Sequence, residues 1–183
     1  MRPSAAMTLA MAALALMALA GCGKKPLEEA VAKNDRDAVA EALKKGGDVN
    51  AKMSNGDTPL LLAVKNGQSS SAQGLIESGA DIKARDDRDN GVLHFAAQNG
   101  MTGICGLLID RGIAVDEKGD AGATPLHFAL LGGRQETAKY LVRRGADLQL
   151  KDESGRSALD IVERSGDVRL KADLEFAAQS RTN

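Results

Sequence analysis

A repeat of 33 residues constrains the fold of this 183-residue chain more than any other sequence feature. Two series of leucines and two series of glycines recur at this spacing: Leu60, Leu93, Leu126 and Leu159; Leu75, Leu108, Leu141 and Leu174; Gly67, Gly100, Gly133 and Gly166; Gly46, Gly79, Gly112 and Gly145. A fixed period of about 20–50 residues is typical of chains built from one stacked structural unit. We therefore expect about five copies of a single unit.

The pattern inside each unit predicts two helices joined by a short turn. Thr58 and Thr124 each precede a proline, which favours a capped helix start with proline at its first position. Apolar residues then recur on one helical stripe, and Asn-Gly pairs such as Asn66-Gly67 turn the chain into a second helix. Glycines such as Gly145 end that helix, and further glycines supply the turn of a hairpin between units.

The third unit departs from this pattern. Asp89-Asn90-Gly91-Val92 stands where the other units favour Gly-x-Thr-Pro. The helix that contains Leu93 therefore lacks both the capping threonine and the first-turn proline, and we expect Asp89 or Asn90 to cap it.

Stacking follows from the helical stripes, because one helix pair cannot bury its own apolar side chains. The terminal units of such a stack need polar outer faces, and both ends of the sequence carry charged residues: Glu28, Glu29, Lys33, Asp35 and Arg36 in the first unit; Arg164, Asp167, Arg169, Lys171 and Asp173 in the last. We therefore expect a monomer whose ends do not polymerise.

The segment Gly122-Ala123-Thr124-Pro125-Leu126-His127-Phe128-Ala129 resembles the ankyrin repeat, as does Gly145-Ala146-Asp147. The resemblance implies an all-α solenoid of about five helix-turn-helix units with β-hairpin-like fingers, which we expect to follow an N-terminal signal peptide. We expect the following organisation: signal peptide 1–21, lipidated cysteine and linker 22–26, N-terminal capping repeat 27–55, repeats 56–88, 89–121 and 122–154, and C-terminal capping repeat 155–183.

The N-terminus has the pattern of a secretory signal, with Arg2 followed by an apolar run over residues 5–20. The run is short and rich in alanine, so a transmembrane helix is the weaker interpretation. Leu19-Ala20-Gly21-Cys22 resembles the lipobox of bacterial lipoproteins. This resemblance implies acylation of Cys22, with an ordinary thiol near a standard cleavage site as the alternative, and a periplasm-facing anchor in the cell envelope. Gly23 after the cysteine resembles outer-membrane sorting.

Composition excludes several kinds of partner and chemistry. Lys and Arg (24) nearly balance Asp and Glu (25), and the chain has one Tyr, three Phe and no Trp, so we expect no nucleic acid partner. Two His and two Cys are too few for a tetrahedral zinc site or a disulfide framework, and the familiar catalytic and phosphate-binding motifs are absent from the sequence. We therefore expect no enzyme activity, no metal and no cofactor.

His94 and His127 occupy the histidine position of the ankyrin motif, where the resemblance implies that the imidazole ties one loop to the next. Their equivalent places in adjacent units argue against a catalytic role. Cys105 aligns with Ala72 and Ala138, which indicates a small buried side chain.

The ankyrin resemblance implies a protein partner bound through fingertips and first helices. We predict contacts from these residues: Lys52, Met53, Arg85, Asp86, Arg88, Met101, Lys118, Asp120, Leu131, Arg134 and Asp152. Leu131, where other units are polar, is expected to be exposed and to form an apolar centre with Met53 and Met101 inside a charged rim. The alternatives are a merely solvated rim and Leu130 packing alone.

Two functions fit these expectations. One is an envelope scaffold or adaptor that holds a protein partner. The other is an inhibitor, because some ankyrin lipoproteins resemble immunity proteins that neutralise lipase effectors in the periplasm.

Overall fold

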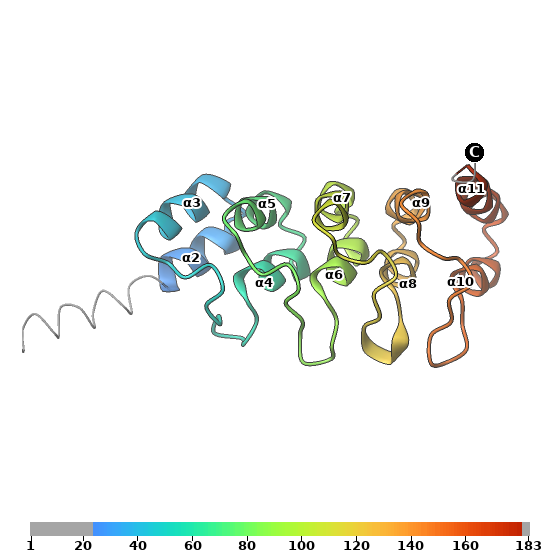
Figure 1. Cartoon of the computed structure of the whole chain (residues 1–183), viewed down its shortest axis with the longest axis horizontal. Helices are drawn as coiled ribbons and strands as arrows, with labels where there is room; N and C mark the ends of the chain where they lie inside the picture. The colour runs from blue at the N-terminus through green and yellow to red at the C-terminus, as the bar shows by residue number, and fades with distance from the viewer. Residues whose placement is uncertain (1–23, 181–183) are drawn as a thin grey trace, which may run out of the picture.

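The computed structural model describes residues 24–180, which form five antiparallel helix pairs stacked in one row (Figure 1). The pairs are α2 (Lys24–Ala32) with α3 (Arg36–Lys44), α4 (Pro59–Lys65) with α5 (Ser69–Glu77), α6 (Val92–Gln98) with α7 (Thr102–Asp110), α8 (Pro125–Leu131) with α9 (Gln135–Arg143), and α10 (Ala158–Ser165) with α11 (Val168–Gln179). The expected signal peptide and Cys22 lie outside the described residues.

The helices form two layers (Figure 1). The first helix of each pair, which we call the inner helix, lies beside the loops that connect the units, and the second, or outer, helix lies on the far side. The connecting loops project in one direction as fingers. Residues 24–180 contain no extended strand, and two fingers close only through isolated bridges, Arg85–Gly91 and Lys151–Ser157. The expected all-α solenoid is confirmed.

The aligned leucines form the core. Leu60, Leu93 and Leu126 of the inner helices are fully buried, and so is the outer-helix series Leu75, Leu108, Leu141 and Leu174. Full burial of a leucine side chain contributes roughly 1.5–3 kcal/mol. Leu159 is only half-buried, because the last unit has no following neighbour to cover it.

Thr58 and Thr124 are the N-cap residues of α4 and α8, as expected, but only Thr58 caps its helix through a side-chain hydrogen bond to a helix N–H. Thr58 is the N-cap of α4, and its side chain accepts a hydrogen bond from the Leu61 N–H at 3.3 Å. Thr124 is the N-cap of α8 and donates its own N–H to Nδ1 of His127 at 3.2 Å. Proline follows in both helices, as the sequence pattern predicts.

The prediction that Asp89 or Asn90 caps α6 is wrong, since Gly91 is the N-cap. The side chain of His94 reaches back from the first turn, and its Nδ1 accepts the Gly91 N–H at 3.1 Å. Asn90 is turned away from α6, and its Oδ1 accepts the N–H of Asp120 in the next finger at 2.9 Å. His94 thus pairs with the N–H of the N-cap residue, as His127 does in α8, and α6 has no side-chain cap of the threonine kind.

The four fingers share one backbone hydrogen bond at the 33-residue spacing. The N–H of Met53, Asp86, Gly119 and Asp152 each donates to the carbonyl four residues later, at 2.8–3.0 Å. Gly56, Gly122 and Gly155 adopt positive φ at the turn of these fingers, and Asp89 holds the same position with φ of 64°. The second finger thus places a side chain where the other three use glycine.

The expectation of polar end faces is wrong for the last outer helix. Val168 and Phe176 of α11 are 79% and 71% exposed, alongside the charged residues that the sequence identified. Within residues 24–180, no helix is both long and apolar enough to cross a bilayer.

We predict that Asp89→Gly stabilises the protein by about 1 kcal/mol, because a left-handed backbone costs an L-residue roughly that much and glycine almost nothing. The exposed contact of the Asp89 carboxylate with Arg85, at 3.6 Å, offsets little of this gain. Denaturant unfolding of the chain without its apolar N-terminal segment measures the change. Asp87→Gly is the matched control, since Asp87 is exposed in the same finger and does not adopt positive φ. Equal effects of the two substitutions would refute the assignment of strain to Asp89.

Candidate functional site

The inner helices present two rows of side chains at the 33-residue spacing. The first, which we call the inner row, consists of the half-buried residues Leu62, Phe95, Phe128 and Ile161. The second, the end row, follows three residues later and consists of Lys65, Gln98, Leu131 and Arg164. In α6 and α8 these rows are uncharged, and the two phenyl rings lie edge to face with centroids 6.3 Å apart.

Lys65 of the end row links the fingers to the inner row. Its Nζ lies 2.8 Å from Oδ1 of Asp57 and 3.5 Å from Oδ2 of Asp86, which belong to two successive fingers. The same ammonium group lies 5.0 Å from the centroid of Phe95. A chain of contacts therefore runs from the fingers through Lys65 to the aromatic pair. We call the surface formed by the two rows and the fingers the finger-side face.

The surroundings of Lys65 stabilise its charged form. Burial lowers the pKa of Lys65, but the hydrogen bond and charge of Asp57, with the charge of Asp86, outweigh burial and raise this pKa above its ordinary value. A cation over an aromatic ring adds roughly 0.5–1 kcal/mol at a partly exposed site. Lys65 therefore keeps its positive charge beside Phe95 of the inner row.

Leu131 is the exposed apolar residue of this face. Its side chain is 62% exposed at the end of α8, as the sequence indicated, while Leu130 is half-buried against the core. Gly132 directly after it allows α8 to end close to α6, since a Cβ there would collide with the Gln98 carbonyl oxygen. Leu131 thus sits beside Gln98 in the end row.

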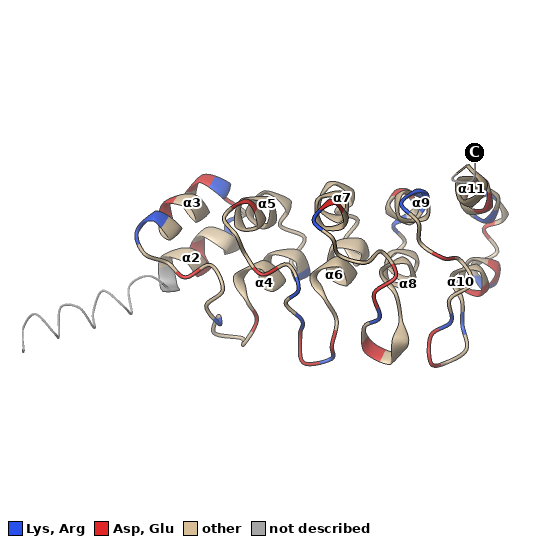
Figure 2. Ribbon diagram, in the orientation of Figure 1, with Lys and Arg blue, Asp and Glu red and all other residues tan. Residues whose placement is uncertain are grey.

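Charged fingertips surround the two rows. Figure 2 shows acidic and basic residues interspersed along the fingers. Among the predicted contact residues, six are exposed: Lys52, Arg88, Lys118, Asp120, Leu131 and Arg134. The first four lie on fingers, whereas Arg134 lies in the turn between α8 and α9 and donates from Nε to the Gln98 carbonyl at 3.1 Å.

The structure corrects the predicted contact role of Met53, Asp86 and Asp152. These residues occupy one position of the repeat, and its side chain turns into the finger rather than toward solvent. Met53 is 7% exposed and joins the core. Oδ1 of Asp152 accepts the N–H groups of Ser154 and Arg156, each at 2.9 Å, and Asp86 closes its own finger in the same way.

Arg85 and Met101 are likewise committed to the fold. Arg85 donates to the Lys118 carbonyl at 2.9 Å and to the Glu117 carboxylate at 3.1 Å, so it joins two fingers. Met101 is 6% exposed and lies on the outer-helix side. The predicted apolar centre of Leu131 with Met53 and Met101 is therefore wrong, because both methionines are buried.

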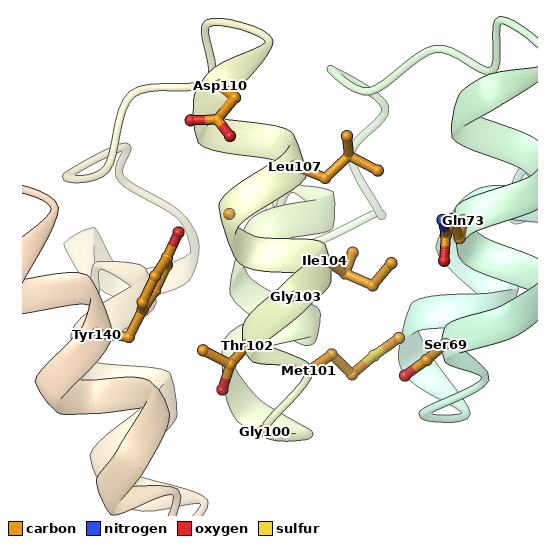
Figure 3. A pocket seen from close by; sticks show the side chains of 11 residues that line it. Ser69, Gln73, Gly100, Met101, Thr102, Gly103, Ile104, Leu107, Asp110 and Tyr140 are labelled. Carbon is orange, nitrogen blue, oxygen red and sulfur yellow. The ribbon is translucent and has the colours of Figure 1, made fainter.

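A hollow of about 720 Å³ lies on the outer helices, away from the fingers (Figure 3). Met101, Ile104 and Leu107 point from α7 toward α5, and Tyr140 points from α9 toward α7. Gly106 of α7 leaves room for Tyr140, whose hydroxyl lies over this glycine. The hollow is open and holds no cluster of catalytic side chains.

The two histidines have structural roles. Nδ1 of His94 and of His127 accepts a backbone N–H, while Nε2 lies 3.2 Å from the Ala123 carbonyl and 3.0 Å from the Arg156 carbonyl, respectively. Each ring is therefore assigned as the tautomer protonated at Nε2, which donates to the next finger. Both imidazole nitrogens are thus occupied, and neither ring is free to act as a general base.

Other chemistry is equally restricted in the part of the chain that the structure describes. Residues 24–180 contain no group of three His, Cys, Asp or Glu side chains that could hold a metal. Cys105 is buried as expected, and burial raises the pKa of its thiol to about 12, so it is not a nucleophile at neutral pH.

Sequence reasoning did not identify the inner row. The signal for it was present, because Leu62, Phe95, Phe128 and Ile161 recur at the same 33-residue spacing as the core leucines. Their half-buried state separates them from the core, and a spacing alone does not reveal exposure.

Comparison with known protein families supports this architecture. The family model described as "Ankyrin repeats (3 copies)" matches residues 6–86 and 85–152. No curated protein matches the chain.

We predict that the folded state loses stability as the pH falls below 3.8, the ordinary pKa of an aspartate. Burial raises the pKa of Asp152, but hydrogen bonds from Arg156 and Ser154 outweigh burial and lower it; the pKa of Asp86 is also lowered, with backbone hydrogen bonds from Asn90 and Arg88 outweighing burial. A lowered carboxyl pKa stabilises the fold above the ordinary value, and this contribution is lost as the pH falls through the lowered one. Thermal unfolding from pH 6 to pH 2 measures the loss, and Asp152→Asn should flatten it. An unchanged acid profile in that variant would contradict the role of Asp152.

Proposed function

The chain belongs to the ankyrin-repeat family of protein–protein interaction modules, and from this premise we propose that it is a lipid-anchored envelope protein whose finger-side face holds a protein partner. Ankyrin-repeat proteins are typically non-enzymatic, which agrees with the occupied histidines and the buried thiol.

The arrangement around Leu131 carries the proposal. Protein interfaces combine a core of aromatic and aliphatic side chains with a polar rim. Here the exposed Leu131 lies at the end of the helix that carries Phe128, and Phe128 contacts Phe95. The fingertips supply the rim, with Lys52, Arg88 and Lys118 exposed.

The charge of the rim favours a protein over a polyanion. Basic and acidic residues are interspersed along the fingers, and the whole chain has a formal net charge of −1. Nucleic acids and strongly anionic surfaces require a basic patch. A folded protein with interspersed charges of both signs fits this rim better.

The proposed anchor lies next to the first helix. Cys22 is the last residue of the lipobox-like segment, and only Gly23 separates it from Lys24, where α2 begins. Because an extended residue spans at most about 3.6 Å, acylation of Cys22 would hold the solenoid directly at the bilayer. We propose that the protein faces the periplasm, and that Gly23 directs it to the outer membrane.

An immunity function is the second candidate, and the short tether favours it. A solenoid fixed at the bilayer is well placed to bind an effector that attacks lipids there. A scaffold has no need of such close attachment. The immunity proposal predicts a toxin gene beside the gene for this chain, and deletion should make cells sensitive to toxin-producing neighbours. Wild-type survival of the deletion strain beside such neighbours would favour the scaffold.

We predict that Leu131→Asp abolishes capture of the partner without unfolding the domain, because a charge replaces the exposed apolar side chain at the centre of the face. Photo-crosslinkers at Lys52, Arg88 and Lys118 in intact cells identify the attached protein by mass spectrometry, and the yield of that adduct is compared in the variant.

Gln73→Asp is the matched control for Leu131→Asp, since Gln73 is exposed on the outer helix α5. It should leave the adduct unchanged. Full capture by Leu131→Asp would overturn the assignment of the face, and loss of its helical circular dichroism signal would place Leu131 in the core.

The anchor is tested separately. We predict that Cys22→Ser abolishes incorporation of labelled palmitate and moves the protein from the membrane fraction to the soluble fraction. The fold should be unchanged, because the described helices begin at Lys24. Palmitate incorporation that persists in this variant would exclude Cys22 as the acylated residue.

A further inference from the structure

The last outer helix, α11, has an apolar stripe on its exposed side. Val168 and Phe176 are 79% and 71% exposed, and Ala172 lies between them. A helix turns about 100° per residue, so positions separated by four residues share one face. We call these three residues the α11 stripe. The opposite face buries Leu170, Leu174 and Ala177.

The other outer helices provide an internal comparison. At the positions equivalent to the α11 stripe they carry mostly polar or small residues: Arg36, Ala40 and Lys44 in α3; Ser69, Gln73 and Glu77 in α5; Thr102, Gly106 and Asp110 in α7; Gln135, Lys139 and Arg143 in α9. Among the described outer helices, α11 alone presents a valine and a phenylalanine there. The stripe is therefore a property of this helix and not of the repeat.

The charges beside the stripe are arranged symmetrically about Ala172. Arg169 and Lys171 precede it, and Asp173 and Glu175 follow it at the same distances along the chain. This order is opposite to that favoured by the helix dipole, which attracts acidic residues to the N-terminus and basic residues to the C-terminus. It is also the weaker orientation for ion pairs four residues apart. The stability of an isolated α11 does not explain the pattern.

Ion pairs within the solenoid account for only two of these four charged residues. Lys171 lies 2.5 Å from the Glu163 carboxylate, and Asp173 lies 3.6 Å from the Lys139 ammonium group. Across residues 24–180, by contrast, neither Arg169 nor Glu175 forms an ion pair.

We propose that the α11 stripe binds the same stripe of a second copy of this chain, with the two helices antiparallel. In this arrangement a two-fold axis passes beside Ala172, and Val168 packs on Phe176 of the second copy. Arg169 and Asp173 lie on one side of the stripe, and Lys171 and Glu175 lie on the other. Each basic residue therefore meets an acidic residue of the second copy: Arg169 meets Asp173, and Lys171 meets Glu175.

The contact between the two α11 helices is small. A helix of 12 residues is about 18 Å long, so one helix pair buries less than the roughly 1,200 Å² of a standard interface. The dimer is therefore weak and reversible. The finger-side face lies on the other layer of the solenoid, so both copies keep that face accessible (Figure 1).

A membrane surface fits the stripe less well than a second copy. Amphipathic helices that lie on anionic bilayers flank their apolar face with Lys and Arg. Here Asp173 and Glu175 flank half of the stripe, so anionic headgroups would be repelled there.

A symmetric crosslink tests the dimer in the full-length chain. Ala172→Cys places two thiols beside the two-fold axis, where the close approach of helices paired through alanine allows a disulfide. Mild oxidation of intact cells should give a covalent dimer, seen on a non-reducing gel. The unsubstituted chain controls for Cys22 and for the buried Cys105, and Gln73→Cys is the matched control at the equivalent position of α5.

A charge exchange tests the pairing. In the Ala172→Cys background, Arg169→Glu combined with Glu175→Arg keeps the net charge and places charges in the order that the helix dipole favours, so α11 should fold. It also turns each attractive pair across the interface into a repulsive one, and we expect the dimer yield to fall about tenfold.

Three outcomes would overturn the proposal. They are a monomeric Ala172→Cys chain, an equal dimer yield from Gln73→Cys, and a dimer yield that the charge exchange leaves unchanged. If vesicles of anionic lipid protect the introduced thiol from maleimide while no dimer forms, the stripe is assigned to the membrane instead.

Discussion

Every helix pair in this protein depends on its neighbours for burial. The aligned leucines Leu60, Leu93 and Leu126 of the inner helices are fully buried, whereas Leu159, at the same position of the last inner helix, remains half-buried. A single pair cannot enclose its own stripe, so stability arises at the junctions between units and spreads along the row. The finger-side face inherits its shape from these junctions, because the helices that carry Phe95 and Phe128 are placed by the leucines beneath them.

Polar groups make the junctions specific. His94 and His127 each accept the N–H of the N-cap residue of their own helix and donate to a carbonyl of the next finger, so one side chain links a helix start to the neighbouring finger. Arg85 adds a second link between fingers through Lys118 and Glu117. The buried polar atoms of these links have partners, which is required when they are removed from water. The rim of the finger-side face is therefore held by the same bonds that hold the fold.

The repeat made the fold predictable, since its spacing identified the helix pairs, the buried leucines, the threonine caps and the role of the histidines. Exposure was less predictable. Met53 and Met101 resemble surface contacts in the alignment, yet one turns into its finger and the other faces the outer layer. The N-cap of α6 escaped sequence reasoning because it is Gly91, which has no side chain to mark it, and His94 accepts the Gly91 N–H. The side chains of the inner row and of the α11 stripe differ from those of the core in solvent exposure. That exposure depends on the packing of the neighbouring unit and not on the residue type.

The identical hydrogen bond in all four fingers has an evolutionary implication. This position holds a methionine, a glycine and two aspartates (Met53, Gly119, Asp86 and Asp152), but the backbone contact that each makes is the same. Duplication or loss of a complete 33-residue segment between two fingers would therefore preserve this backbone hydrogen bond in each finger and change only the number of repeats. The recognition surface can lengthen or shorten in steps of one finger without a new folding problem, while the first helix pair and the terminal α11 remain in place.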